Sequence, residues 1–262
     1  MYNYLEKILA QKKNEIRIKK KKFGDKIYSV VKPEKNNKPF YQRLKNINGI
    51  NCIGEIKKSS PSKGLIRENF DYREIAKTYD QLNLSAISVL TEEKFFHGKP
   101  EFISGVKEIS SLPVLRKDFI FDLFQVYESV FLKTDAILLI CNLLSAENLR
   151  NMIELSDKLG LETLVEVHSE DEIKKAVDAN AQIIGINNRN LKSFETEISV
   201  STKLAKFIPE KCIKISESGI NSAGDINLLH QAGFNAVLIG EYFMKSKNIK
   251  KAYKKLFVNG TS

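Results

Sequence analysis

The chain has 262 residues, of which 42% are hydrophobic and 28% charged, enough to bury the core of one large domain or two small ones. With 13 Gly and 6 Pro, it is neither collagen-like nor of low complexity. The longest apolar run, residues 136–141, is far too short to cross a bilayer, and the Lys-rich first twenty residues lack the apolar stretch of a secretory signal. We expect a cytoplasmic protein.

Residues 1–48 are predicted to form an N-terminal basic helical extension. They carry 14 Lys and Arg against 4 Asp and Glu, which accounts for the whole net charge of +10. Apolar residues recur with helical spacing at Leu5, Ile8, Leu9 and Ile16, with lysines on the other face. A nucleic-acid-binding arm would use such charge for phosphate contacts, but the segment has no arginine cluster, glycine-rich tract or aromatic pattern. We expect a helix packed on the main domain and no nucleic-acid partner.

From residue 50 onward, short β-branched runs alternate with amphipathic helical stretches. The expected strands are Cys52–Lys57, Ser85–Leu90, Val114–Lys117, Ala136–Ile140, Thr163–Val167, Ile183–Asn187, Ile213–Ser216 and Ala236–Ile239. The expected helices include Tyr72–Leu82, Ala146–Leu159, Glu170–Ala179, Ile198–Phe207 and Ala223–Ala232. Eight strand–helix units favour a closed barrel, because doubly wound sheets typically use about six strands. The sequence predicts an α/β fold, a (β/α)8 TIM barrel over residues 49–262 that forms one structural unit with the N-terminal helical extension.

The cysteines and histidines do not form a metal-binding pattern. Cys52, Cys141 and Cys212 lie far apart in apolar segments, and no pair has the spacing of a zinc or redox site. We expect them to be small buried hydrophobic residues. The three histidines are equally scattered, so the sequence predicts no metal site.

Polar side chains end five of the expected strands, where a buried parallel strand is usually almost purely apolar. These side chains are Glu55 and Lys57, Lys117, Glu166, Asn187 with Arg189, and Glu217 with Ser218. The carboxyl ends of the strands meet at the rim of a TIM barrel that carries the active site. Any one of these residues alone could be an ordinary polar residue on a rim that faces water. Polar residues at five strand ends together predict a catalytic site.

Two lysines and three carboxylates in one barrel mouth suit acid–base chemistry. A lysine beside carboxylates can protonate a carbonyl or a leaving hydroxyl, and a glutamate can take a proton. A Schiff base on Lys57 or Lys117 remains open on the same residues. Further along the chain, Ser218, Gly219 and Gly240 can present backbone N–H groups to a phosphate, although each glycine alone also suits a simple turn.

Six segments, in order along residues 50–245, resemble motifs of the indole-3-glycerol phosphate synthase family. They are 55–64 (EIKKSSPSKG), 88–92 (SVLTE), 115–119 (LRKDF), 164–168 (LVEVH), 186–191 (INNRNL) and 216–220 (SESGI). The first resembles the family's E-x-K-x-x-S-P-S-x-G signature, and residues 5–16 are similar to its N-terminal helical extension. Sister isomerase barrels share the phosphate-type loops but lack this signature.

The resemblance implies a carboxy-lyase of tryptophan biosynthesis. Its small-molecule substrate would be 1-(2-carboxyphenylamino)-1-deoxyribulose 5-phosphate, and its products indole-3-glycerol phosphate, carbon dioxide and water. The reaction needs no cofactor and no metal. Neither the sequence nor the resemblance says whether the protein is a monomer or a dimer.

The resemblance also implies roles for individual residues. Lys117 would protonate the ketone during ring closure, and Glu166, with Lys57 as a possible partner, would serve the dehydration. Which of Lys57 and Arg189 holds the carboxylate and which the phosphate stays open. The remaining catalytic positions would orient the lysines and the substrate, or bind the phosphate: Glu55, Asn187, Glu217 and Ser218.

Further positions are expected to complete the substrate site. Phe96 and Phe119 resemble family positions that wall the aromatic ring, with ordinary packing as the alternative. Ser60 belongs to a loop over the barrel mouth that Pro61 restricts. Glu241 follows Gly240 where a phosphate approaches, so we expect its carboxylate to face solvent and its backbone N–H to serve the phosphate.

Overall fold

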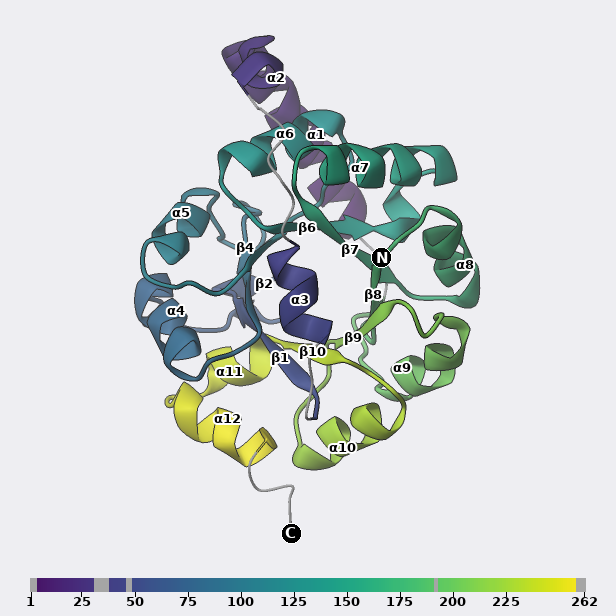
Figure 1. Ribbon diagram of the computed structural model, residues 1–262. Coiled ribbons are helices and arrows are strands. Elements are labelled where there is room, and N and C mark those ends of the chain that lie inside the picture. The colour runs from purple at the N-terminus through teal and green to yellow at the C-terminus, as the bar shows by residue number, and fades with distance from the viewer. Residues whose placement is uncertain (1–3, 31–37, 46–48, 191–192, 258–262) are drawn as a thin grey trace.

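The protein folds as a closed (β/α)8 barrel, seen in a computed structural model that describes residues 4–30, 38–45, 49–190 and 193–257 (Figure 1). The barrel order is β1-β10-β9-β8-β7-β6-β5-β4, with every pair parallel. The strands are β1 Asn51–Ile56, β4 Ala86–Leu90, β5 Val114–Lys117, β6 Ala136–Ile140, β7 Glu162–Val167, β8 Ile183–Asn187, β9 Ile213–Glu217 and β10 Ala236–Ile239. The predicted strands are therefore confirmed to within one residue at each end.

A ring of helices surrounds the barrel (Figure 1). It comprises α4 Tyr72–Gln81, α5 Glu101–Lys107, α6 Leu123–Phe131, α7 Ala146–Lys158, α8 Glu170–Asp178, α9 Ser199–Leu204, α10 Ala223–Gln231, α11 Glu241–Lys245 and α12 Ile249–Phe257, with 3-10 turns η1 Cys141–Leu143 and η2 Ala205–Phe207. Side-chain caps begin many of these helices at the carboxyl rim, for example Ser169 on α8 and Ser222 on α10. The loop after β1 forms a small hairpin of β2 Ser59–Ser60 and β3 Gly64–Leu65.

Two apolar clusters hold the barrel together. Alternate strand residues such as Ile53 and Leu164 fill its interior, and the others pack against the surrounding helices.

The three cysteines are buried and free, as expected. Within the described ranges, no helix has the length and apolarity needed to span a membrane.

The N-terminal segment reaches both ends of the barrel. Its helices are α1 Tyr4–Phe23, α2 Lys26–Val30 and α3 Pro39–Lys45. Figure 1 looks along the barrel axis with α3 in front of the centre of the ring, where Phe40 and Leu44 join the interior cluster. Because Glu162 begins β7 and accepts the Phe40 and Tyr41 N–H groups at 2.7 Å each, α3 closes the amino end of the barrel.

The prediction that α1 packs on the barrel is confirmed, but the prediction that its lysines lie on the other, exposed face is wrong for one of them. Ile8 and Ile16 are buried, as predicted for the apolar stripe. Lys12 shares this buried face instead of the exposed one and is 1% exposed. Its ammonium lies 3.0 Å from Glu15 and 3.0 Å from Asp118, which follows β5. Two carboxylates therefore compensate the burial of its charge.

Candidate active site

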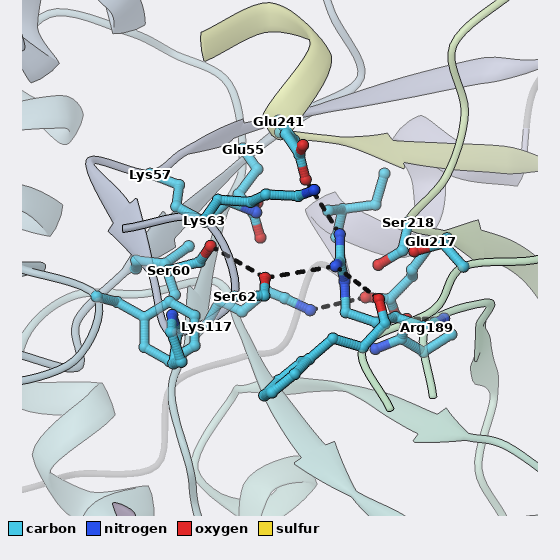
Figure 2. Close-up of a pocket in the computed structure, with 18 of the residues that line it drawn as sticks. Glu55, Lys57, Ser60, Ser62, Lys63, Lys117, Arg189, Glu217, Ser218 and Glu241 are labelled. Carbon is cyan, nitrogen blue, oxygen red and sulfur yellow. Dashed lines mark hydrogen bonds and ion pairs between the residues drawn. The ribbon is translucent and has the colours of Figure 1, made fainter. Parts of the chain in front are cut away.

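A cavity of about 490 Å³ opens at the carboxyl ends of the strands (Figure 2). Its lining includes every predicted site residue: Glu55, Lys57, Ser60, Phe96, Lys117, Phe119, Glu166, Asn187, Arg189, Glu217, Ser218, Gly219, Gly240 and Glu241. These residues come from widely separated parts of the chain. The parallel barrel brings them together because each lies at the end of a barrel strand or in the loop that follows it.

Lys117 lies between two carboxylates at the centre of the site. Its Nζ is 2.7 Å from Glu217 and 3.2 Å from Glu166. Burial opposes the lysine charge, but Glu217, Glu166 and Glu55 outweigh it and raise the pKa of Lys117 above its usual value. Lys117 is therefore a charged ammonium near neutral pH, which suits a proton donor better than the free amine that a Schiff base requires.

The two carboxylates have different proton affinities. Burial, reinforced by neighbouring Glu166, raises the pKa of Glu217 to about 7 despite the attraction of Lys117. For Glu166, burial acts in the same direction, but Lys117, His168 and a hydrogen bond from Asn187 overcome it and lower the pKa. Environments that separate the pKa values of neighbouring acids are typical of acid–base sites. Glu166 is thus ionised near neutral pH, and Glu217 is the carboxyl that titrates near neutrality.

A second pair lies at the end of β1. Glu55 and Lys57, predicted to share one face of the strand, are 2.5 Å apart between Oε2 and Nζ. A Cβ on Gly240 would collide with the Glu55 carboxylate, and a Cβ on Gly185 would collide with that of Glu217. These two glycines therefore make room for the carboxylates of Glu55 and Glu217. Gly240 has an ordinary φ of −118°, so space and not turn conformation demands glycine there.

Backbone conformation shapes the predicted phosphate loop after β9. Ser218 and Gly219 both have left-handed conformations, with φ of 68° and 80°. The missed residue Asn188 holds this loop, because its side-chain amide donates to the Ser218 and Glu217 carbonyl oxygens, each at 3.0 Å. The loop is thereby fixed beside Gly240, the residue before the short helix α11.

Glu241 departs from its expected position. We expected its carboxylate to face solvent, but Oε2 lies 3.1 Å from Arg189 and Oε1 lies 2.6 Å from Lys245 (Figure 2). Opposite charge explains the difference, since the guanidinium of Arg189 reaches across the cavity from the loop after β8. Arg189 also donates to the Ser62 hydroxyl at 3.5 Å, which connects the β2–β3 hairpin to this pair. Leu191, in the matched motif of this loop, lies outside the described residues.

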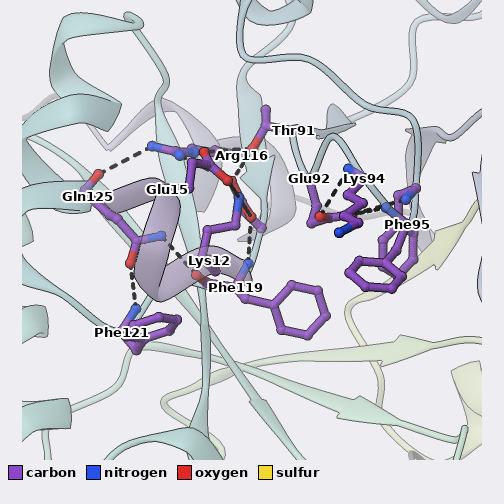
Figure 3. A network of polar contacts seen from close by, with 12 residues as sticks. Lys12, Glu15, Thr91, Glu92, Lys94, Phe95, Arg116, Phe119, Phe121 and Gln125 are labelled. Atoms are coloured by element: carbon purple, nitrogen blue, oxygen red, sulfur yellow. Dashed lines mark hydrogen bonds and ion pairs between the residues drawn. The ribbon is translucent and has the colours of Figure 1, made fainter. Parts of the chain in front are cut away.

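An apolar wall faces the charged groups. The rings of Phe96 and Phe119 lie 6.1 Å apart at the cavity. The missed residue Glu92 shapes the loop before Phe96, because its buried carboxylate accepts the backbone N–H groups of Lys94, Phe95 and Phe96 (Figure 3). Its position two residues after β4 was the available signal.

Helix α1 also contributes to the apolar wall. The basic composition of this helix did not indicate that role. Tyr4, Leu5 and Ile8 line the cavity. The Tyr4 ring packs edge-on against Phe194 of the loop after β8, at 5.9 Å. The helical extension is thus part of the site as well as packing on the barrel. Among the described residues, no three or more His, Cys, Asp or Glu side chains are grouped to hold a metal ion.

The fold and site together define a class: a (β/α)8-barrel enzyme with paired lysines and carboxylates beside a glycine-containing rim. Comparison with known proteins then gives the family. The sequence model described as indole-3-glycerol phosphate synthase matches residues 5–256, and the chain belongs to this family.

Curated relatives agree over nearly the whole chain. An indole-3-glycerol phosphate synthase of Ruminiclostridium cellulolyticum is 45% identical over 247 residues, covering 92% of this chain and 94% of its own. That of Legionella pneumophila strain Paris is 43% identical over 259 residues, covering 99% and 100%.

Solved structures share the barrel at much lower identity. The KGPDC of Streptococcus mutans gives a TM-score of 0.63 at 12% identity, covering 79% of this chain and 95% of that one. Orotidine 5'-phosphate decarboxylase of Pyrococcus horikoshii gives 0.62 at 12%, covering 80% and 99%. At this identity the likeness concerns the fold alone.

Proposed function

We propose that this protein converts 1-(2-carboxyphenylamino)-1-deoxyribulose 5-phosphate to indole-3-glycerol phosphate, carbon dioxide and water, with Lys117 as the general acid of ring closure. The observation that carries this assignment is the charged Lys117 between Glu166 and Glu217 in the cavity. We also assign the protein to the cytoplasm, with residues 1–48 and 49–262 working as one structural unit.

Ring closure needs a proton donor. The aromatic carbon that bears the carboxylate attacks the ketone carbon, and Lys117 gives the carbonyl oxygen a proton as the new bond forms. Loss of carbon dioxide leaves its bonding electrons in the ring and restores aromaticity. Glu217 keeps Lys117 in place and charged, because it is the carboxylate nearest to the ammonium, at 2.7 Å.

Dehydration needs a second donor and a base. The hydroxyl leaves as water with one proton from an acid, and a base removes one proton to form the indole. Ionised Glu166 suits the base, and Lys57 suits the acid, since Glu55 holds its ammonium at 2.5 Å. Asn187 orients Glu166 through the side-chain hydrogen bond between them.

Binding divides the cavity into an anionic end and an apolar wall. Backbone N–H groups at Ser218, Gly219 and Gly240 suit the phosphate. The anthranilate ring fits against Phe96 and Phe119. The carboxylate on this ring is the second anion of the substrate, and Lys57 or Arg189 binds it. Ser60 is positioned to shape the entrance from the β2–β3 hairpin.

Indole fluorescence tests this function directly, because the chain contains no tryptophan. Purified protein mixed with the substrate is expected to produce growing indole emission. Lys117→Ala is expected to lower kcat by about 10²- to 10⁴-fold, the usual contribution of a general acid. Lys211→Ala, on the exposed surface, is the matched control and keeps wild-type activity. A folded wild type that makes no indole product would refute the proposed reaction.

A further inference from the structure

His168 lies directly behind Glu166, on a part of the rim that the reaction as described leaves without a role. It follows the last residue of β7. Its Nε2 lies 3.7 Å from Glu166 Oε1, while Lys117 contacts the other oxygen, Oε2, at 3.2 Å. The Glu166 carboxylate thus lies between an ammonium on the cavity side and an imidazole behind it.

Helix α8 holds the imidazole from the other side. Glu172, in its first turn, accepts the His168 backbone N–H at 2.8 Å, and the same oxygen lies 3.5 Å from Nδ1. The Ser169 hydroxyl caps this helix by accepting the Glu172 N–H. The result is a row of alternating charge: Glu172, His168, Glu166, Lys117 and Glu217.

The ring is enclosed rather than solvated. Its side chain is 18% exposed, and both nitrogens are buried without a well-formed hydrogen bond to any residue that the structure describes. A buried imidazole between two carboxylates has an electrostatic reason to carry a proton. Surface packing alone would not place both of its nitrogens toward acids.

We propose that His168 is a positioning residue: its imidazolium, anchored by Glu172, holds the outer oxygen of Glu166 and so controls the proton transfer that Glu166 makes. This inference rests on the proposed function of Glu166. Lys117 orients one carboxylate oxygen and His168 the other, which fixes the direction from which Glu166 takes a proton.

The electrostatics of the neighbourhood agree with this role. Burial opposes the charge, but Glu172, Glu166 and Glu217 outweigh it and raise the pKa of His168 above its usual value. From η1, Cys141 contacts the Glu172 carbonyl oxygen at 3.4 Å. This thiol stays neutral because burial raises its pKa to about 11, even though Lys175 of α8 opposes the rise. When pH exceeds the pKa of His168, Glu166 loses its second cation.

The test compares the pH dependence of the wild type with that of His168→Gln, which keeps a polar side chain but no charge. Below the pKa of His168, the wild-type kcat is expected to exceed that of the variant about tenfold, with KM within about twofold. The ratio should fall toward one as pH rises through that pKa. Because Glu217 also titrates near neutrality and interacts with His168, the pH at which the ratio falls is compared with the pKa of His168 measured directly. His230→Gln, at an exposed histidine, is the matched control and follows the wild type.

Nuclear magnetic resonance supplies a readout that does not depend on turnover. The chain has three histidines, so the ring of His168 can be assigned by comparison with His168→Gln and titrated. Glu166→Gln and Glu172→Gln should each lower the pKa of His168 by more than about half a unit, because each removes a facing negative charge.

The outcomes are distinct. A kcat ratio that is constant over pH, or one near one throughout, overturns the proposal. So does a pKa of His168 that Glu166→Gln leaves unchanged. A wild type that makes no product refutes the proposed function instead, and the titration still decides whether His168 and Glu166 are coupled.

Discussion

At the scale of single residues, charge pairing inside the cavity decides which groups are available to a ligand. Arg189 is held by Glu241 at 3.1 Å and by the Phe194 carbonyl oxygen at 3.2 Å. Burial opposes ionisation of Glu241, but Lys245, Arg189 and Lys57 overcome it and lower its pKa, so it is negative near neutral pH. A phosphate that enters the rim therefore meets a carboxylate that competes for the same guanidinium.

Glu241→Gln is expected to tighten phosphate binding. The substitution removes the negative charge and frees Arg189, so the dissociation constant of inorganic phosphate, measured by isothermal titration calorimetry, should fall by about three- to tenfold. Glu210→Gln, an exposed charge-matched change, should leave it unaltered. Weaker phosphate binding to Glu241→Gln would show that the carboxylate supports the anion site instead of opposing it.

At the scale of elements, the attachment of α1 to the barrel depends on a buried charge network (Figure 3). Lys12 and Arg116 both contact Asp118, at 3.0 and 3.1 Å. Arg116 also contacts Glu128 of α6 at 2.7 Å, and Lys19 of α1 meets the same carboxylate at 2.8 Å. Although burial opposes ionisation, Lys12 and Arg116 lower the pKa of Asp118 to about 2, so this aspartate is ionised near neutral pH.

Lys12→Met is expected to loosen α1. Removal of one partner from an isolated buried pair typically costs about 3 to 5 kcal/mol. Lys12→Met should cost less than this, because Arg116 still contacts Asp118. We expect a lower thermal midpoint and faster trypsin cleavage within residues 4–23. Lys13→Met, at the exposed neighbouring position, controls for the loss of a lysine. Equal cleavage of the two variants would show that the apolar contacts of α1 suffice to dock it.

At the scale of the whole molecule, the closed barrel is sealed at its amino end by α3. Burial raises the pKa of Glu162 to about 7, although the N–H groups of Tyr41 and Phe40 favour its ionised form. A carboxyl whose pKa is raised in the folded state binds its proton more tightly there than in the unfolded chain. Its contribution to stability is therefore fully present below about pH 4.5, its usual pKa, and is lost as pH rises toward 7.

Glu162→Gln is expected to remove this pH dependence. Urea unfolding at about pH 5 and about pH 8 should show a larger decrease of midpoint in the wild type than in the variant. Identical pH dependence in the two proteins would show that Glu162 does not titrate in this range.

The sequence predicted much of this architecture and of its site because both depend on local pattern. Alternating apolar residues fix each strand, and the residues at its carboxyl end, such as Lys117 and Glu166, must reach the same rim once parallel strands close. The roles proposed for these residues remain predictions that the experiments above test.

The contacts between distant segments were not readable in the same way. Lys12 looked like one more surface lysine until the fold placed it beside Asp118, and Glu241 looked exposed until Arg189 reached it. His168 seemed one of three scattered histidines, yet α8 brings Glu172 to it. Periodicity along the chain determined the barrel and which residues lie at its carboxyl rim. Which charges meet was decided only by the tertiary structure, because ion pairing depends on distance in space and burial, and neither is a property of local sequence.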